Sequence, residues 1–203
     1  VAFAHDVPYQ PDLAAAIDAL KPTVLIGVST IHGAFDEMIV RKMSALNERP
    51  IIMPLSNPTS KAECTFEQAV RWSDGKVVFA SGSPFPPMKY EGRTLYPAQA
   101  NNAYVFPALG HAAVLAGAKE VTDDVFLAAA EALGTMTTEI ELAVGKLFPD
   151  FDSIRAVSHD LTARVCELME RDGVGAKPAG VTDWRKYVDS QFWEPEPETS
   201  SKL

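Results

Sequence analysis

The chain has few cysteines, no long hydrophobic run and no excess of basic residues, and each absence excludes a class of protein. Its two cysteines, Cys64 and Cys166, form no C-x-x-C pair, which argues against a zinc knuckle or disulfide framework and favours a reducing compartment. No apolar run approaches about 18 residues, so we expect no membrane-spanning helix. With 27 acidic against 18 basic residues and a net charge of -9, we expect no nucleic-acid partner.

The sequence also lacks a recognisable catalytic or phosphate-binding motif. It has no G-x-G-x-x-G segment, so the main pyrophosphate site of a dinucleotide fold is missing. The histidines are scattered, without metal-ligand spacing, at positions His5, His32, His111 and His159. His111, on an apolar helix, is interpreted as a packing residue, whereas the role of His32 stays open. Asp123 and Asp124 are interpreted as charges at a helix N-terminus rather than metal ligands.

The first part of the chain alternates strands and helices. Apolar periodicity and caps predict helices over 11–20, 34–46 and 65–72, and apolar runs predict strands over 23–28, 50–55 and 76–80. Strand, helix and strand in this order form a βαβ unit, whose strands are parallel and whose crossover is right-handed. A surface hairpin is expected around Glu91-Gly92, and residues 97–107 are expected to form a loop. Helices are expected to dominate after residue 107.

The predicted strands end in small or hydroxylic residues. These ends read Val28-Ser29-Thr30, Leu55-Ser56-Asn57 and Ala80-Ser81-Gly82. In open α/β sheets, ligands bind beyond the carboxyl ends of the strands, and small residues there let a flat ligand approach the backbone. Ordinary turn chemistry selects the same residue types, so that alternative stays open.

Asparagine side chains are the strongest candidates for ligand contacts. Asn57 follows a buried strand, and Pro58 biases it toward an extended or turn conformation. Its amide can both donate to and accept from a carboxylate, a hydroxyl or a nicotinamide carboxamide, but it cannot act as an acid or base. The alternative is an Asx turn that closes the strand. Asn101 and Asn102, flanked by apolar residues, form a second set of amides that need partners if they are buried.

Several segments together resemble the carboxyl-terminal part of malic enzyme, in particular its NADP-dependent, plant-like branch. They are residues 21–27, 47–52, 55–65, 79–85 and 101–107, and the resemblance extends from Phe3 to about Trp193. It implies an α/β fold, namely the distal half of a Rossmann-like parallel-sheet NAD(P)-binding domain followed by a helical C-terminal region. The expected division is a partial NAD(P)-binding domain over 1–150, C-terminal helices over 151–192 and a disordered tail over 193–203.

The resemblance also implies an activity. Malic enzyme oxidises malate with NADP, NAD being possible, and decarboxylates the product to pyruvate with Mg or Mn. The implied lysine base, tyrosine acid, substrate-binding arginine and metal-binding carboxylates belong to sequence before Val1. We therefore expect a fragment that is inactive alone, with no catalytic residue and no metal ligand of its own.

The residues that carry over from the family are binding residues. Substrate-binding positions are Asn57, Asn101 and Asn102, and cofactor-binding positions are Val28, Ser29, Thr30, Leu55, Ser56, Asn57 and Asn102. The chain departs from the family in two places, since residues 29–33 and 108–111 are less glycine-rich than expected. The first departure leaves the role of His32 open.

Partners and location are further expectations. The resemblance implies malate as substrate and a homodimer or homotetramer of the full-length enzyme. The final Ser201-Lys202-Leu203 matches a peroxisomal address, with the cytoplasm or another organelle as the alternative. Alternatives for function are a non-catalytic nucleotide-binding or oligomerisation module, or half of another α/β dehydrogenase.

Overall fold

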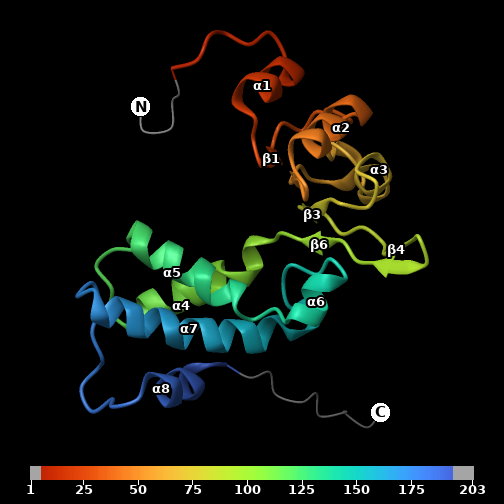
Figure 1. The fold of residues 1–203 in the computed structure, drawn as a ribbon. Coiled ribbons are helices and arrows are strands. Elements are labelled where there is room, and N and C mark those ends of the chain that lie inside the picture. The colour runs from red at the N-terminus through yellow and green to blue at the C-terminus, as the bar shows by residue number, and fades with distance from the viewer. Residues whose placement is uncertain (1–5, 194–203) are drawn as a thin grey trace, which may run out of the picture. The chain divides into compact units, whose positions relative to one another are not determined.

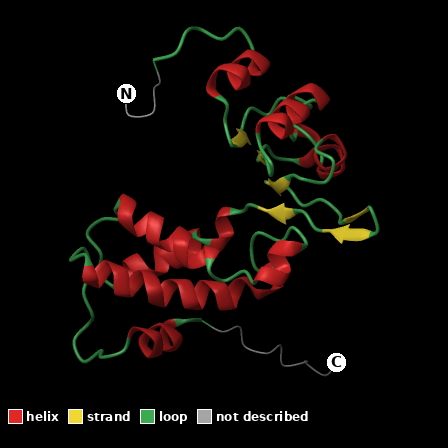
Figure 2. Cartoon of the chain, in the orientation of Figure 1, coloured by secondary structure: helices red, strands yellow, loops and turns green. Residues whose placement is uncertain are grey.

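The computed structural model describes residues 6–193, and the chain divides into two compact units (Figures 1 and 2). The first unit comprises Val1–Asn101 and Thr137–Phe148, and the second comprises Asn102–Met136 and Pro149–Leu203. The units therefore interleave along the sequence. The expected division into 1–150, 151–192 and 193–203 stays a prediction.

A parallel sheet organises the first unit. Its strands are β1 (Val24–Gly27), β2 (Ile51–Pro54), β3 (Val78–Ser81) and β6 (Ala98–Gln99), in the spatial order β1-β2-β3-β6. All neighbouring pairs are parallel, and Gly27 lies opposite Pro54 in the β1–β2 register. The separate hairpin β4 (Met88–Tyr90) and β5 (Arg93–Leu95) confirms the hairpin predicted around Glu91-Gly92.

Short helices precede, connect and follow these strands. They are α1 (Leu13–Leu20), α2 (Glu37–Leu46), the 3-10 helix η1 (Thr59–Lys61), α3 (Phe66–Trp72) and α6 (Glu139–Ala143). Thr65 and Gln68 form the predicted capping box of α3. The core contains fully buried Met43 of α2 and Ile52 of β2. These apolar contacts hold α2 against the sheet and so fix the ends of β1 and β2.

The second unit is helical. It contains η2 (Asn102–Tyr104), α4 (Phe106–Leu115), α5 (Asp123–Gly134), η3 (Phe151–Ser153), α7 (Ile154–Arg171) and α8 (Trp184–Gln191). Figure 1 shows α4 and α5 lying alongside the long α7. Ala108 and Ala112 of α4 are fully buried in the same core as Val165 and Met169 of α7, because their small side chains let the two helices approach closely.

Most predicted elements are confirmed, and the differences have local causes. The helix expected from residue 34 begins at Glu37, because the Asp36 side chain caps it. The loop expected over 97–107 contains β6, which forms because β3 offers an unpaired edge. The helix expected from residue 108 begins at Phe106, with Pro107 tolerated in its first turn. Within residues 6–193, none of the helices combines the length and apolarity needed to cross a bilayer.

Candidate functional site

The carboxyl ends of β1, β2 and β3 meet at one edge of the sheet in the first unit. This follows from the parallel pairing, which aligns Gly27 with Pro54 and Ile52 with Phe79. Backbone bonds continue past the strands, since Leu55 N–H donates to Gly27 O at 2.8 Å and Gly82 N–H donates to Pro54 O at 3.2 Å. The three predicted strand ends are therefore neighbours, and we call this region the carboxyl edge.

Asn57 lies exposed at the carboxyl edge, directly after β2. Its Oδ1 accepts a hydrogen bond from Ser83 Oγ, and its Nδ2 donates to Leu55 O over 3.3 Å. The second contact is longer than the usual 2.7–3.2 Å range of such bonds. The peptide bond to Pro58 is cis. The amide nitrogen of Asn57 thus keeps its capacity to donate to a ligand.

Gly82 lies where the chain segments that follow β2 and β3 approach each other closely. A Cβ at this position would stand 2.3 Å from Leu55 O and 2.8 Å from Asn57 Nδ2. No other residue type fits without displacing backbone, because real Cβ atoms do not approach a carbonyl oxygen so closely. The predicted small residue at this strand end is therefore required by the backbone itself.

The exit of β1 is tied to the exit of β2 through Thr30. The Thr30 N–H donates to Ser56 Oγ at 2.9 Å, and its hydroxyl donates to Ser29 O at 2.6 Å. Thr30 has φ +59°, a left-handed conformation that β-branched residues rarely adopt. Such strain persists only where surrounding contacts hold it, and it is typical of functional loops.

Below these loops lies the carboxylate of Glu63, which is 0% exposed. Its Oε1 accepts from Ser29 N–H at 2.9 Å, from Ser29 Oγ at 2.9 Å and from Ser56 Oγ at 2.5 Å. Gly27 makes room for this group, because a Cβ there would lie 2.5 Å from Glu63 Cδ. Two predicted cofactor-binding residues are thus anchored on one buried acid.

The electrostatics of Glu63 favour its charged form. Burial by itself raises the pKa of the carboxyl group, but the hydrogen bonds from Ser56 and Ser29 outweigh it and hold the pKa below its ordinary value of 4.5. At neutral pH Glu63 is therefore a carboxylate whose bonds to the two serines are charge-assisted.

The other predicted site residues fall into two groups. Val28 is 74% exposed at the end of β1, and Leu55 is half-buried after β2. Asn101 leaves the sheet at the same edge, since the ladder continues to Ala100 N–H, which donates to Ser81 O at 2.9 Å. Asn102 begins η2 in the second unit. The carboxyl edge therefore groups the predicted residues of the first unit, and Asn102 belongs to the second unit.

The sequence did not indicate the roles of three residues at this site, which are Glu63, Ser83 and Gly82. The role of Gly82 is steric. Glu63 sits between Ala62 and Cys64, and a single acidic residue in such a segment is no sign of burial. The burial of the residues on both sides of Glu63 could have suggested that Glu63 is buried too. That burial, however, is itself a property of the tertiary structure.

The described residues also show the surroundings of His111, of His32 and of the two cysteines. His111 is half-buried against Phe192, with ring centroids 4.8 Å apart, which agrees with its interpretation as a packing residue. Burial and the neighbouring His159 lower the pKa of His111. Burial raises the pKa of both thiols, Cys64 and Cys166, to about 12, so neither is a nucleophile at neutral pH. His32 is exposed in the loop after β1.

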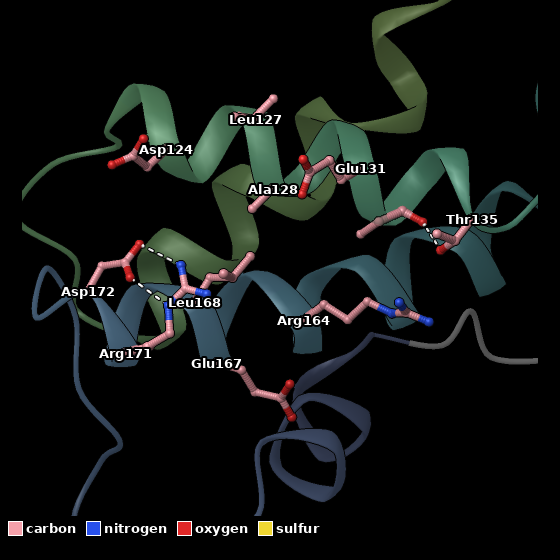
Figure 3. A pocket seen from close by; sticks show the side chains of 11 residues that line it. Asp124, Leu127, Ala128, Glu131, Thr135, Arg164, Glu167, Leu168, Arg171 and Asp172 are labelled. Atoms are coloured by element: carbon pink, nitrogen blue, oxygen red, sulfur yellow. Dashed lines mark hydrogen bonds and ion pairs between the residues drawn. The ribbon is translucent and has the colours of Figure 1, made fainter.

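Each unit also has a cavity that is lined by other residues. A groove of about 640 Å³ runs between α5 and α7 in the second unit. Figure 3 shows Arg171 paired with Asp172 on its wall, and the nitrogen and oxygen of this ion pair are 2.7 Å apart. A cavity of about 390 Å³ lies at the amino-terminal end of β3, opposite the carboxyl edge, with Phe66, Leu95 and Arg93 in its lining. None of the predicted site residues lines either cavity. Among residues 6–193, no three His, Cys, Asp or Glu side chains come together as a metal site.

Comparison with known proteins identifies relatives along almost the whole chain. The sequence profile of the family "Malic enzyme, NAD binding domain" matches residues 3–170. NADP-dependent malic enzyme 3 of Arabidopsis thaliana is 44% identical over 193 residues, which is 95% of this chain and 33% of that protein. The chloroplastic NADP-dependent malic enzyme of Zea mays is also 44% identical, over 95% of this chain and 30% of its own length. The chain thus spans about a third of the curated relatives it matches.

Solved structures agree on the fold. The malic enzyme of Entamoeba histolytica aligns with a TM-score of 0.65 and 22% identity, over 87% of this chain and 32% of that chain. The malic enzyme of Pyrococcus horikoshii Ot3 aligns with a TM-score of 0.63 and 25% identity, over 87% of this chain and 35% of that chain. The parallel sheet with its carboxyl edge is therefore a Rossmann-like NAD-binding arrangement, and the chain belongs to the malic enzyme family.

Proposed function

We propose that the full-length protein oxidises L-malate with NADP and decarboxylates the product to pyruvate and CO2, and that this chain supplies the cofactor- and substrate-facing edge of its active site. The observation that carries the proposal is the convergence of Asn57, Ser29 and Thr30 at the carboxyl edge of a sheet whose family is shown. The NADP-dependent relatives support NADP as the cofactor, with NAD as the alternative.

The carboxyl edge fits the nicotinamide end of such a cofactor. Gly82 brings two backbone segments close together without a side chain between them, and exposed Val28 offers an apolar surface beside them. The Asn57 amide can donate to a carboxamide or to a malate carboxylate. When bound, NADP accepts the hydride that malate loses on oxidation.

In this proposal, the residues of the chain bind and orient rather than transfer protons. Ser29 and Thr30 line the cofactor. Asn57 holds the substrate or the carboxamide in position, and Asn101 and Asn102 do the same from the segment that follows β6. Neutral amides and hydroxyls cannot serve as a general base near neutral pH. Proton transfer is therefore assigned to parts of the protein outside this chain.

The described residues do not fit a metal site, since they provide no cluster of ligands. We therefore derive no step through Mg or Mn from this chain. Metal binding, and assembly into a homodimer or homotetramer, are proposed for the full-length protein from its family alone.

The test is a steady-state assay of the full-length protein with malate, Mg or Mn, and either NADP or NAD. We expect malate-dependent NADPH formation with stoichiometric pyruvate, and a higher kcat/KM with NADP than with NAD. If neither cofactor is reduced, while calorimetry still detects NADP binding, the chain belongs to a non-catalytic nucleotide-binding module instead. Absence of both activity and binding would reject the proposal.

Location is a separate proposal. Ser201-Lys202-Leu203 lies outside the described residues, and we propose it as a peroxisomal address if Leu203 ends the natural protein. A fluorescent protein fused in front of residues 190–203 should collect in peroxisomes, and deletion of the last three residues should abolish this. Equal distribution of both fusions would favour the cytoplasm or another organelle.

A further inference from the structure

Glu63 connects the two loops that carry the predicted cofactor contacts. One loop follows β1 and contains Ser29 and Thr30, and the other follows β2 and runs from Ser56 through η1 to Glu63 itself. The carboxylate receives three hydrogen bonds, two from Ser29 and one from Ser56, all on Oε1. The loops are also joined by the backbone, since Phe35 N–H donates to Glu63 O at 3.0 Å.

Packing in the hydrophobic core does not by itself explain why Glu63 is buried. Glu63 is 0% exposed, and its Oε2 has no hydrogen-bond partner among the described residues. A buried carboxylate with an unsatisfied oxygen costs free energy, because the charged group loses its hydration. A side chain of similar size that ended in a methyl or amide group would avoid most of this cost. The charge of Glu63 therefore strengthens the hydrogen bonds that its Oε1 accepts from Ser29 and Ser56 at the carboxyl edge.

The contacts extend from Glu63 to the strained residue of the loop. Ser56 Oγ donates to Glu63 and simultaneously accepts from Thr30 N–H at 2.9 Å. The hydroxyl orientation of Ser56 is thus set by the carboxylate, and this orientation leaves a lone pair for Thr30. The hydrogen-bond chain Glu63–Ser56–Thr30 therefore ends on the left-handed residue of the loop.

We propose that Glu63 is a positioning residue for the cofactor, which holds Ser29, Thr30 and Ser56 in the arrangement that receives the nicotinamide end of NADP. The inference rests on the proposed function, and it adds a residue that touches neither substrate nor cofactor. A purely structural role would lower stability without changing cofactor affinity in the protein that remains folded. A positioning role changes affinity for NADP more than for malate.

The test compares Glu63→Gln with Glu67→Gln in the full-length protein. Glu67 is an exposed residue of α3 that pairs with Arg71 at 2.9 Å, so the same chemical change is made four residues away without touching the carboxyl edge. For Glu63→Gln we expect the KM for NADP to rise roughly tenfold, with the KM for malate changing less than about threefold, since small displacements of binding groups cost this much. Glu67→Gln should retain wild-type values for both.

A second readout does not need turnover. The thermal midpoint of each variant is measured with and without saturating NADP, because a ligand stabilises the folded state in proportion to the logarithm of its affinity. We expect the NADP-induced shift to shrink in Glu63→Gln and to be nearly lost in Glu63→Ala. The partial rescue by glutamine is expected because its Oε1 can still accept from Ser29 and Ser56 without the charge.

The outcomes separate this inference from the proposed function. If wild-type protein oxidises malate and Glu63→Gln is folded with unchanged KM for NADP and an unchanged thermal shift, the positioning role is overturned and the function stands. If wild-type protein neither binds NADP nor reduces it, the proposed function has failed first. A lowered midpoint with unaltered cofactor affinity in both Glu63 variants would assign the residue a structural role only.

Discussion

The hydroxyl of Ser83 donates a hydrogen bond to Oδ1 of Asn57, and this bond joins the exits of β2 and β3. Because the amide oxygen is used in this way, the orientation of the Asn57 side chain is fixed and its nitrogen is the group presented to a ligand. The amide oxygen of Asn57 therefore bonds to a side chain at the next strand exit, and not to the backbone two residues on as an Asx turn requires.

Asn57→Ala should lower kcat/KM for malate in the full-length enzyme by about 1–3 kcal/mol of transition-state stabilisation, the usual cost of removing a hydrogen-bond partner from a polar group that becomes buried when the ligand binds. Steady-state kinetics with varied malate measures it. Asn47→Ala is the matched control, because Asn47 donates to Pro22 O and Met43 O at the other end of the sheet. It should lower the thermal midpoint but leave kcat/KM unchanged. Wild-type kinetics in Asn57→Ala would refute the assigned role.

Gly82→Ala should destabilise the protein by about 1–3 kcal/mol, because overpacking forces backbone to move. The new Cβ would meet Leu55 O at 2.3 Å. Gly110→Ala is the opposite case, since nothing lies within 4 Å of its added Cβ in α4. That change should stabilise the protein by about 0.5–1 kcal/mol through helix propensity. Urea unfolding of both variants gives the comparison, and equal effects of the two changes would contradict the predicted contact.

Cys64 and Cys166 should resist alkylation in the native protein. Burial raises the pKa of each thiol to about 12, and for Cys64 the neighbouring Glu63 charge adds to this, so the reactive thiolate is scarce at neutral pH. Iodoacetamide treatment followed by peptide mass spectrometry should find both residues unmodified, and fully modified after denaturation. Rapid labelling of either cysteine in the native protein would show that its surroundings open readily.

The contribution of the Glu63 carboxylate to the free energy of unfolding should depend on pH. Its pKa is lower in the folded protein than the ordinary value of 4.5, so the contribution is fully present above pH 4.5 and is lost as the pH falls through the folded value. The difference in unfolding free energy between wild type and Glu63→Gln should therefore shrink as the pH is lowered below 4.5. Denaturant unfolding at a series of pH values measures this difference, and a difference that stays constant with pH would contradict the shift.

Much of the local structure follows from residues close together in the sequence. The caps Thr65 with Gln68 and Thr138 with Glu141 are where their spacing predicts them, because a capping box involves only one turn of helix. The β2 segment follows from a short apolar run between prolines. The position of Asn57 at a strand exit, and hence its candidacy as a ligand contact, is equally a consequence of local sequence.

The relation between distant segments was decided by the tertiary structure. Ser29 and Glu63 are 34 residues apart, and their contact exists only because the parallel register of β1 and β2 brings two loops over one buried carboxylate. Likewise, Ala98 and Gln99 carry no strand signal of their own and pair because β3 leaves an open edge. Local propensity acts over about one helical turn, whereas burial and strand pairing depend on chain segments that meet only in the folded state. The sequence therefore determined the elements and the family motifs, and the fold decided that an acid unnoticed in the sequence supports the carboxyl edge.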